Sequence, residues 1–255
     1  MRRRVAVAAA ALVALAGCGD DAAVSDRGGG GRPELVVSAA ASMKEALTAC
    51  SKDYDGASLR LQFAGSDELA AQIRQGVPVD VFAAANTALP DALAREGKLD
   101  QPAAFASNQL VLAVPADGAK VSSLDDLEQP GVTLVIGAAG VPVGDYTRKV
   151  LDRLGARTSK AVLANVRSNE PDVNGVVGKL SQGAADAGFV YASDVEASGG
   201  RLKAIALPAR LDPTATYAAG VVTASRQPDA AEAFVDDLLA GSCHEALLAA
   251  GFGEP

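Results

Sequence analysis

One local pattern recurs along the chain: a short apolar strand, a run of very small residues, and then a helix. Its first copy spans Leu35 to Glu45, where the strand leads into Ser-Ala-Ala-Ala-Ser. Ser42 stands at the expected N-cap, and Glu45 three residues later completes a capping box. The small side chains let a ligand approach the first free N–H groups of the helix, which together with the helix dipole favour an anion. On this copy alone, helix capping is the simpler interpretation of Ser42.

Similar turns follow later strands. Strands are expected at 59–63, 133–137 and 161–166, and the turns after them contain Ala64-Gly65-Ser66, residues 138–144 and Pro171-Asp172-Val173. Strands that alternate with helices predict a parallel sheet with crossover helices. Ligands of such sheets bind beyond the carboxyl ends of the strands, so we expect these turns to face one cleft.

Two similar β/α halves predict a two-lobe molecule. A long apolar strand near Asn108 links them, and a second crossing is expected near Asp212. We therefore expect one lobe to contain residues 33–109 and 212–255, and the other to contain residues 110–211. The 255 residues, about 49% of them hydrophobic, are enough for two lobes with cores of their own.

The N-terminus has the features of an export signal. Three arginines at 2–4 precede an apolar run, and Leu15-Ala16-Gly17-Cys18 matches a bacterial lipobox. Residues 1–17 are then a lipoprotein signal peptide, Cys18 carries the lipid, and residues 18–32 are a flexible tether. A plain signal peptide with a chance cysteine is the alternative. We expect the mature protein to be extracytoplasmic and lipid-anchored to the outer face of the cell membrane, since no later segment is suited to span a bilayer.

The charge balance limits the partners. The chain has 23 basic and 31 acidic residues, and loss of the three N-terminal arginines leaves a formal charge of −11. Without a basic cluster, nucleic acids and anionic membrane surfaces are not expected partners. A bound anion would have to be held by local dipoles.

The cysteines beyond the lipobox are Cys50 and Cys243. An exported compartment permits a disulfide between them, and the sequence leaves open whether it forms. There is no CxxC motif and no Cys/His spacing typical of a metal site, so no cation site is expected.

Six segments together resemble the periplasmic molybdate-binding proteins, the receptors of molybdate ABC importers. They are Ala39–Ser42, Phe63–Ser66 with Gln72-Ile73 and Gly76, Val79–Phe82, Val141–Gly144 with Tyr146, Pro171–Val173 and Gly188–Asp194. The resemblance extends from Leu35 to Phe252. It implies an α/β, two-lobe type II periplasmic-binding-protein fold with mostly parallel sheets and a cleft between the lobes.

The resemblance also assigns ligand-binding roles. Ser42 and Ser66 match serines that donate from their hydroxyl and backbone N–H groups, Val143 and Val173 match backbone N–H donors, and Tyr191 matches a hydroxyl donor. From the sequence alone, the two valines indicate only a core position, and the tyrosine fits simple packing as well.

The expected ligand is molybdate or tungstate, with no cofactor. A tetrahedral dianion requires donors on all sides, which helix N-termini from two lobes supply without a cation. The resemblance further implies a monomer that delivers its ligand to an ABC permease. A receptor for sulfate, thiosulfate or phosphate is the alternative. An enzyme is not expected, because the chain has no GxSxG motif and no histidine near Ser42 or Ser66.

Two acidic residues depart from the sequence pattern of this family. Asp67 follows Ser66 where the family usually has a small or hydroxyl residue, and Asp145 follows Gly144. Because acids are common in the first turn of a helix, we expect both side chains to point to solvent.

Overall fold

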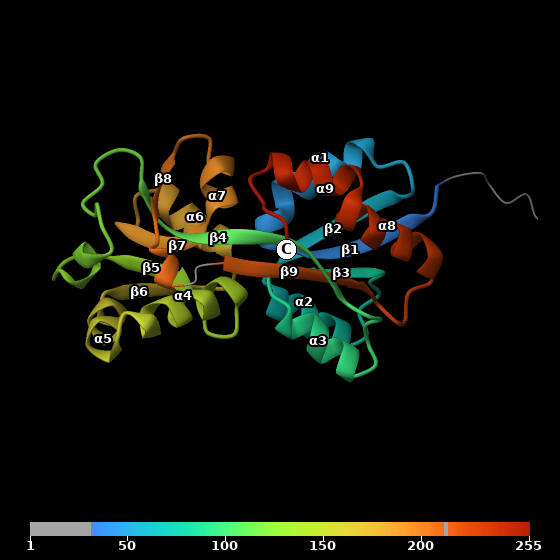
Figure 1. The fold of residues 1–255 in the computed structure, drawn as a ribbon, viewed down its shortest axis with the longest axis horizontal. Helices are drawn as coiled ribbons and strands as arrows, with labels where there is room; N and C mark the ends of the chain where they lie inside the picture. The colour runs from blue at the N-terminus through green and yellow to red at the C-terminus, as the bar shows by residue number, and fades with distance from the viewer. Residues whose placement is uncertain (1–31, 212–213) are drawn as a thin grey trace, which may run out of the picture. The chain divides into compact units, whose positions relative to one another are not determined.

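Strands and helices alternate through most of the chain, as the sequence predicts (Figure 1). In a computed structural model, the described residues are 32–211 and 214–255. The strands are β1 (Glu34–Ala40), β2 (Ser58–Ala64), β3 (Val81–Ala84), β4 (Ala103–Pro115), β5 (Leu134–Gly137), β6 (Val166–Glu170), β7 (Ala187–Tyr191), β8 (Leu202–Ala206) and β9 (Thr214–Val221). The predicted signal peptide, Cys18, all but the last residue of the tether, and Asp212 lie outside the described residues.

The helices occur mainly between these strands. The α-helices are α1 (Lys44–Asp53), α2 (Ser66–Arg74), α3 (Ala88–Arg95), α4 (Pro142–Arg153), α5 (Ala156–Ala164), α6 (Val173–Ser181), α7 (Ala192–Ala197), α8 (Pro228–Ala240) and α9 (Ser242–Ala249), and the 3₁₀ turns are η1 (Ala41–Met43), η2 (Asp125–Glu128) and η3 (Ala209–Leu211). Within the described residues, no helix combines the length and apolar character needed to cross a bilayer.

The sheet has the strand order β2-β1-β3-β9-β4-β7-β5-β6, and β8 also pairs with β4. We call β1–β3, β9, α1–α3, α8 and α9 the first half, and β5–β8 and α4–α7 the second half. Parallel pairs occur within each half, where β1 lies between β2 and β3 and where β5 lies between β6 and β7. Every pair that includes β4 or β9 is antiparallel, so the sheet is less uniformly parallel than expected.

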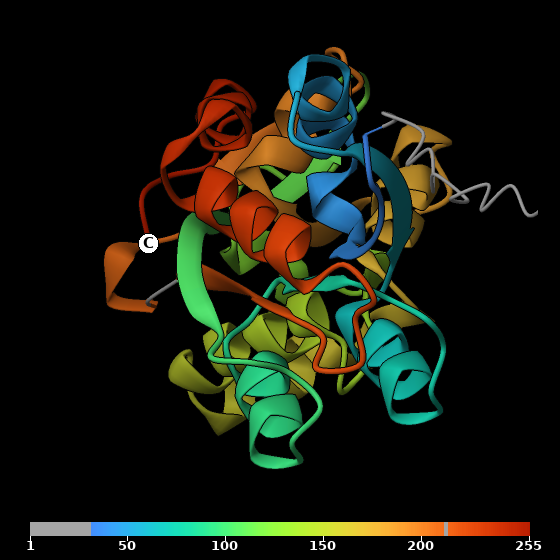
Figure 2. The same cartoon turned by 90° about the vertical axis from the view of Figure 1, so that its right-hand side faces the viewer.

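Strand β4 belongs to both halves. Residues 103–109 pair with β9, and residues 110–115 pair with β7 and β8. Figure 1 shows β4 and β9 running side by side through the centre, with the helices of the two halves to either side. In the first half, α1, α8 and α9 cover one face of the sheet, and α2 and α3 cover the other (Figure 2).

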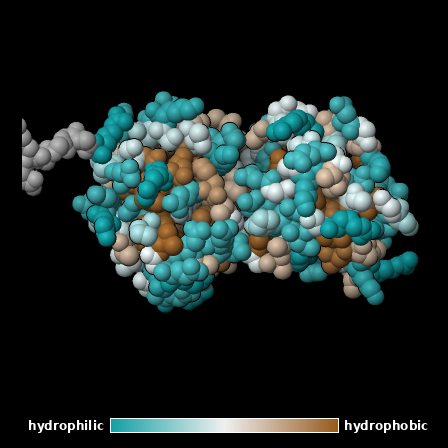
Figure 3. Space-filling view, turned by 180° about the vertical axis from the view of Figure 1, so that it is seen from behind, coloured by the Kyte–Doolittle hydropathy of each residue, from teal (hydrophilic) through white to brown (hydrophobic). Residues whose placement is uncertain are grey.

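Burial explains why these strands form the centre. From Leu35 to Ala40, β1 is buried at every position, as is typical of a parallel strand covered by helices on both faces. One core cluster extends through both halves, and a smaller one lies around Leu69, Phe82 and Leu93 beneath α2 and α3. Polar side chains cover most of the face seen in Figure 3, with smaller apolar patches among them.

One predicted strand is wrong. Residues 161–166 were expected to be extended, but most of them belong to α5, and β6 begins only at Val166. Val162 is fully buried while its neighbour Leu163 is 38% exposed, because only one side of this helix packs on the core. A short apolar run fits both a strand and one face of a helix, so the sequence could not separate the two.

A disulfide joins Cys50 of α1 to Cys243 of α9, with 4.9 Å between their Cα atoms. Asp237 lies beside this pair, and its carboxylate accepts a hydrogen bond of 2.8 Å from the Cys243 backbone N–H. Since the sulfur atoms are bonded to each other and the carboxylate caps α9, we interpret this cluster as a structural link between two helices.

Candidate ligand-binding site

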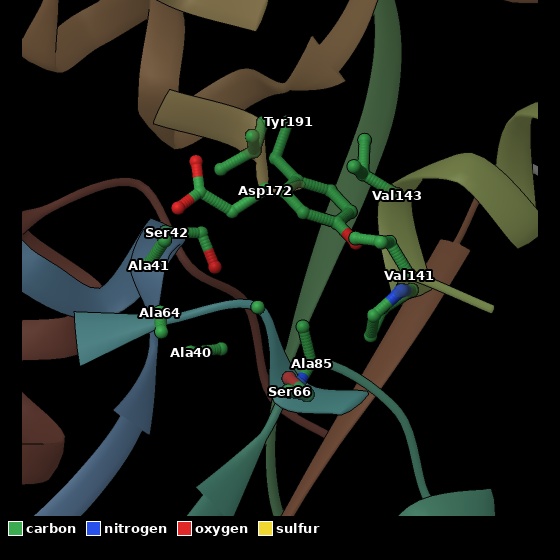
Figure 4. A pocket seen from close by; sticks show the side chains of 13 residues that line it. Ala40, Ala41, Ser42, Ala64, Ser66, Ala85, Val141, Val143, Asp172 and Tyr191 are labelled. Carbon is green, nitrogen blue, oxygen red and sulfur yellow. The ribbon is translucent and has the colours of Figure 1, made fainter. Parts of the chain in front are cut away.

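A cavity lies where the strand-to-helix turns of both halves meet (Figure 4). The space between its walls, including the opening to solvent, is about 210 Å³. The lining residues are Ala40, Ala41, Ser42, Ala64, Gly65, Ser66, Ala85, Val141, Pro142, Val143, Asp172, Val173 and Tyr191. The structure therefore brings together all five residues that the sequence analysis selected as ligand-binding.

Three of the five residues occupy the first turn of a helix. Ser66 is the first residue of α2, Val143 the second of α4, and Val173 the first of α6. Backbone N–H groups at these positions have no partner within their helix, and they carry the positive end of the helix dipole. None of the described residues that line the cavity is a lysine or arginine. The donors that this cavity offers to an anion are therefore backbone N–H and hydroxyl groups.

Ser42 does not cap α1, so the predicted capping box with Glu45 is wrong. Residues Ala41–Met43 form the 3₁₀ turn η1, and α1 begins after it without a side-chain cap. The hydroxyl of Ser42 lies 2.9 Å from the hydroxyl of Tyr217. Small residues at 39–41 allow the tight turn, and the serine side chain is directed to the cavity instead of to the helix.

Ser66 is 1% exposed, and its hydroxyl oxygen accepts a hydrogen bond of 3.1 Å from the backbone N–H of Ala85. This bond ties the start of α2 to the segment after β3. This bond uses a lone pair of the Ser66 oxygen and not its proton, so the hydroxyl can still donate to a ligand.

Tyr191 ends β7, and its side chain is almost completely buried. Its hydroxyl has no hydrogen-bond partner within the described part of the chain. In Figure 4, this hydroxyl points into the space between the labelled residues. Burial raises the pKa of Tyr191 well above its usual value, so the hydroxyl keeps its proton. A buried donor without an acceptor is costly, and a ligand oxygen would satisfy it.

One acid lines the cavity. The side chain of Asp172 caps α6 by accepting a hydrogen bond of 2.9 Å from the Gly175 N–H. This role is absent from the sequence-based prediction, although an acid before a helix is a recognisable N-cap signal.

Asp67 and Asp145, the two acids that depart from the family pattern, do not line the cavity. Asp145 accepts a hydrogen bond of 2.9 Å from the Gly140 N–H in the preceding turn. The prediction that the Asp67 side chain points to solvent is wrong for one of its two carboxylate oxygens. Its Oδ1 is buried and has no hydrogen-bond partner among the described residues.

The sequence of the chain from residue 35 to residue 253 matches the family described as bacterial extracellular solute-binding protein. The chain belongs to this family. The relative named molybdate-binding protein ModA from Mycobacterium tuberculosis is 34% identical over 257 residues, which cover 98% of this chain and 96% of the relative. The predicted resemblance to periplasmic molybdate-binding proteins is thus confirmed.

Solved structures support the fold of this solute-binding protein. The periplasmic molybdate-binding protein of Azotobacter vinelandii has a TM-score of 0.77 at 21% identity, with 87% of this chain and 99% of that chain covered. The sulfate-binding protein SubI of M. tuberculosis has a TM-score of 0.70 at 16% identity, with 87% and 86% covered. The predicted periplasmic-binding-protein fold class is confirmed. Since receptors named for two different anions share the fold, the fold alone does not decide the ligand.

Proposed function

We propose that this solute-binding protein captures molybdate, with tungstate as a second ligand, and delivers it to an ABC permease. The observation that supports this most directly is the buried Tyr191 hydroxyl, which faces a cavity formed by helix N-termini and has no hydrogen-bond partner among the described residues. The identity to relatives named as molybdate-binding proteins supports the choice of anion.

In the proposed complex, the oxyanion accepts hydrogen bonds from both halves. Ser42 and Ser66 donate from the first half, and Val143, Val173 and Tyr191 donate from the second. A hydrogen bond to a charged acceptor contributes on the order of 1.5–3 kcal/mol. Several such bonds, less the costs of association and ordering, are sufficient for roughly micromolar to nanomolar affinity.

We propose that residues 33–109 with 212–255, and residues 110–211, move as two lobes. Strand β4, which pairs within both halves, is the natural hinge. A ligand that bonds to both lobes stabilises the closed arrangement. The closed monomer then docks on the permease, and the lipid on Cys18 keeps it at the membrane. The receptor itself catalyses no reaction.

Calorimetric titration of the purified protein with molybdate, tungstate, sulfate and phosphate tests the ligand. We expect tight binding of molybdate and tungstate and weak binding of sulfate and phosphate. Tyr191→Phe should weaken molybdate binding by about tenfold or more, because one donor to a charged acceptor is lost. Tyr54→Phe is the matched control, since Tyr54 is also buried but packs on Phe234 and does not line the cavity. Failure of the wild-type protein to bind molybdate or tungstate would refute the proposal.

A further inference from the structure

We propose that Tyr217 is a positioning residue for the anion site, which directs the hydroxyl proton of Ser42 toward the ligand. This inference rests on the proposed function, because it concerns how the same site donates to its anion. Tyr217 lies in β9 and is completely buried, and it is not one of the residues that line the cavity. It would therefore act through Ser42 without touching the ligand.

The contact between the two hydroxyl groups supports this role. The oxygen atoms of Ser42 and Tyr217 are 2.9 Å apart, a normal distance for a hydrogen bond, and either residue could be the donor. Each hydroxyl has one proton to donate. If Ser42 donated to Tyr217, it would present only lone pairs to an incoming anion. If Tyr217 donates instead, the Ser42 proton remains available for the ligand.

The Tyr217 phenol has a proton to donate in the second arrangement. Burial raises the pKa of Tyr217 well above its usual value, and the charge of Asp194 adds to this effect, so the phenol keeps its proton. The amide of Asn108, which donates to the Ser193 hydroxyl at 2.7 Å, lies close to the Tyr217 hydroxyl as well.

The ligand itself decides the direction of the bond between the two hydroxyls. An ionised oxyanion only accepts hydrogen bonds. Once it binds beside Ser42, the serine proton is donated to the anion, and the Ser42 oxygen accepts from Tyr217.

Aromatic packing holds the Tyr217 ring in place. Its centroid lies 5.3 Å from that of Phe252, 6.3 Å from that of Phe105 and 5.8 Å from that of Tyr191, all in edge-to-face arrangements. Tyr217 therefore contacts two of the three proposed hydroxyl donors: it bonds to Ser42 of the first half and packs against Tyr191 of the second. A Phe substitution would keep this packing and remove only the hydroxyl group.

A double-mutant cycle separates positioning from simple packing. Molybdate affinity is measured by calorimetry for the wild type, Tyr217→Phe, Ser42→Ala and the combined variant. We expect Tyr217→Phe to weaken binding by about tenfold in the wild-type background and by less than about twofold in the Ser42→Ala background. The melting temperature of each unliganded variant is recorded to show that all are folded at the titration temperature. Tyr54→Phe is again the matched control and should bind like the wild type.

Two results would overturn the inference. One is an unchanged affinity of Tyr217→Phe, and the other is an equal loss in both backgrounds, which would indicate a purely structural role. Both differ from failure of the proposed function, in which the wild-type protein itself does not bind molybdate.

Discussion

Gly65 and Pro171 meet across the candidate site. A Cβ atom added at Gly65 would lie 2.5 Å from the carbonyl oxygen of Pro171, closer than real Cβ contacts allow. Gly65 precedes α2 in the first half, and Pro171 follows β6 in the second. The backbone at Gly65 has φ −59° and ψ 136°, which any residue adopts. The added Cβ atom would also lie 2.8 Å from Asp67 Oδ1. The glycine is therefore required by close contacts, above all with Pro171 of the second half, and not by its own backbone conformation.

Gly65→Ala is expected to weaken molybdate binding by about tenfold or more, because the added methyl group opposes closure of the lobes on the ligand. The unliganded protein should keep its melting temperature to within a few degrees, since the lobes can relax apart. Titration calorimetry and thermal unfolding measure the two effects. Gly178→Ala is the control, because a Cβ atom at Gly178 in α6 would have no neighbour within 4 Å. Equal binding by Gly65→Ala and the wild type would contradict the closure model.

Ser66→Ala is expected to reduce both affinity and stability. It removes a proposed ligand donor, and it also removes the acceptor for the buried Ala85 N–H. A buried donor left without a partner costs about 1–3 kcal/mol. Urea unfolding of the unliganded protein measures this loss. Ser51→Ala is the control, because the exposed Ser51 hydroxyl only donates to the Thr48 carbonyl within α1. An unfolding free energy equal to that of the wild type would show that the Ser66–Ala85 hydrogen bond does not contribute to stability.

The contribution of Asp194 to the stability of the protein is expected to fall as the pH rises from about 4 to about 7. Burial raises the pKa of Asp194 from 3.8 to about 7, the Tyr191 backbone N–H partly opposes this shift, and the charge of Asp172 adds to it. Within this range the folded state binds a proton that the unfolded state has released, so raising the pH favours unfolding. Each unit of pKa difference corresponds to about 1.4 kcal/mol, which gives a loss on the order of 4 kcal/mol.

Urea unfolding between pH 5 and pH 8 measures this slope. Asp194→Asn should flatten it, because asparagine does not titrate and its side-chain oxygen can still accept from the Tyr191 N–H, which now bonds to Asp194 at 2.8 Å. Asp229→Asn, at the exposed start of α8, is the control and should leave the slope unchanged. Equal slopes for the wild type and Asp194→Asn would show that Asp194 is ionised in the folded protein across this range.

Loss of the Cys50–Cys243 disulfide is expected to lower stability and leave binding intact. The cysteines are 193 residues apart in sequence, and closing so long a loop contributes up to roughly 5 kcal/mol in the chain-entropy model. Neither cysteine lines the cavity. The double variant Cys50→Ala, Cys243→Ala is compared with the oxidised and reduced wild type by urea unfolding and by molybdate titration. An equal free energy of unfolding for the double variant and the oxidised wild type would show that the disulfide does not constrain the unfolded chain.

The sequence predicted the order of most strands and helices and the places where their turns meet. These features depend on near neighbours: apolar spacing, small residues after strands, and glycine or proline at helix ends. The family resemblance then selected Ser42, Ser66, Val143, Val173 and Tyr191, and the structure places all five at one cavity. Local patterns were insufficient for residues 161–166, where the same apolar run fits a strand and a helix.

The tertiary structure alone decided how the site is supported. The partner of Ser42 is Tyr217, 175 residues away, and the local capping pattern around Ser42 gives no sign of it. Three further features likewise depend on segments that are distant in sequence. They are the Tyr191 hydroxyl, which has no partner in the described part of the chain, the buried Asp194 carboxylate, and the contact of Gly65 with Pro171. Hydrogen bonding and burial of these groups are set by what packs against them in space, whereas the sequence pattern records only what is adjacent along the chain.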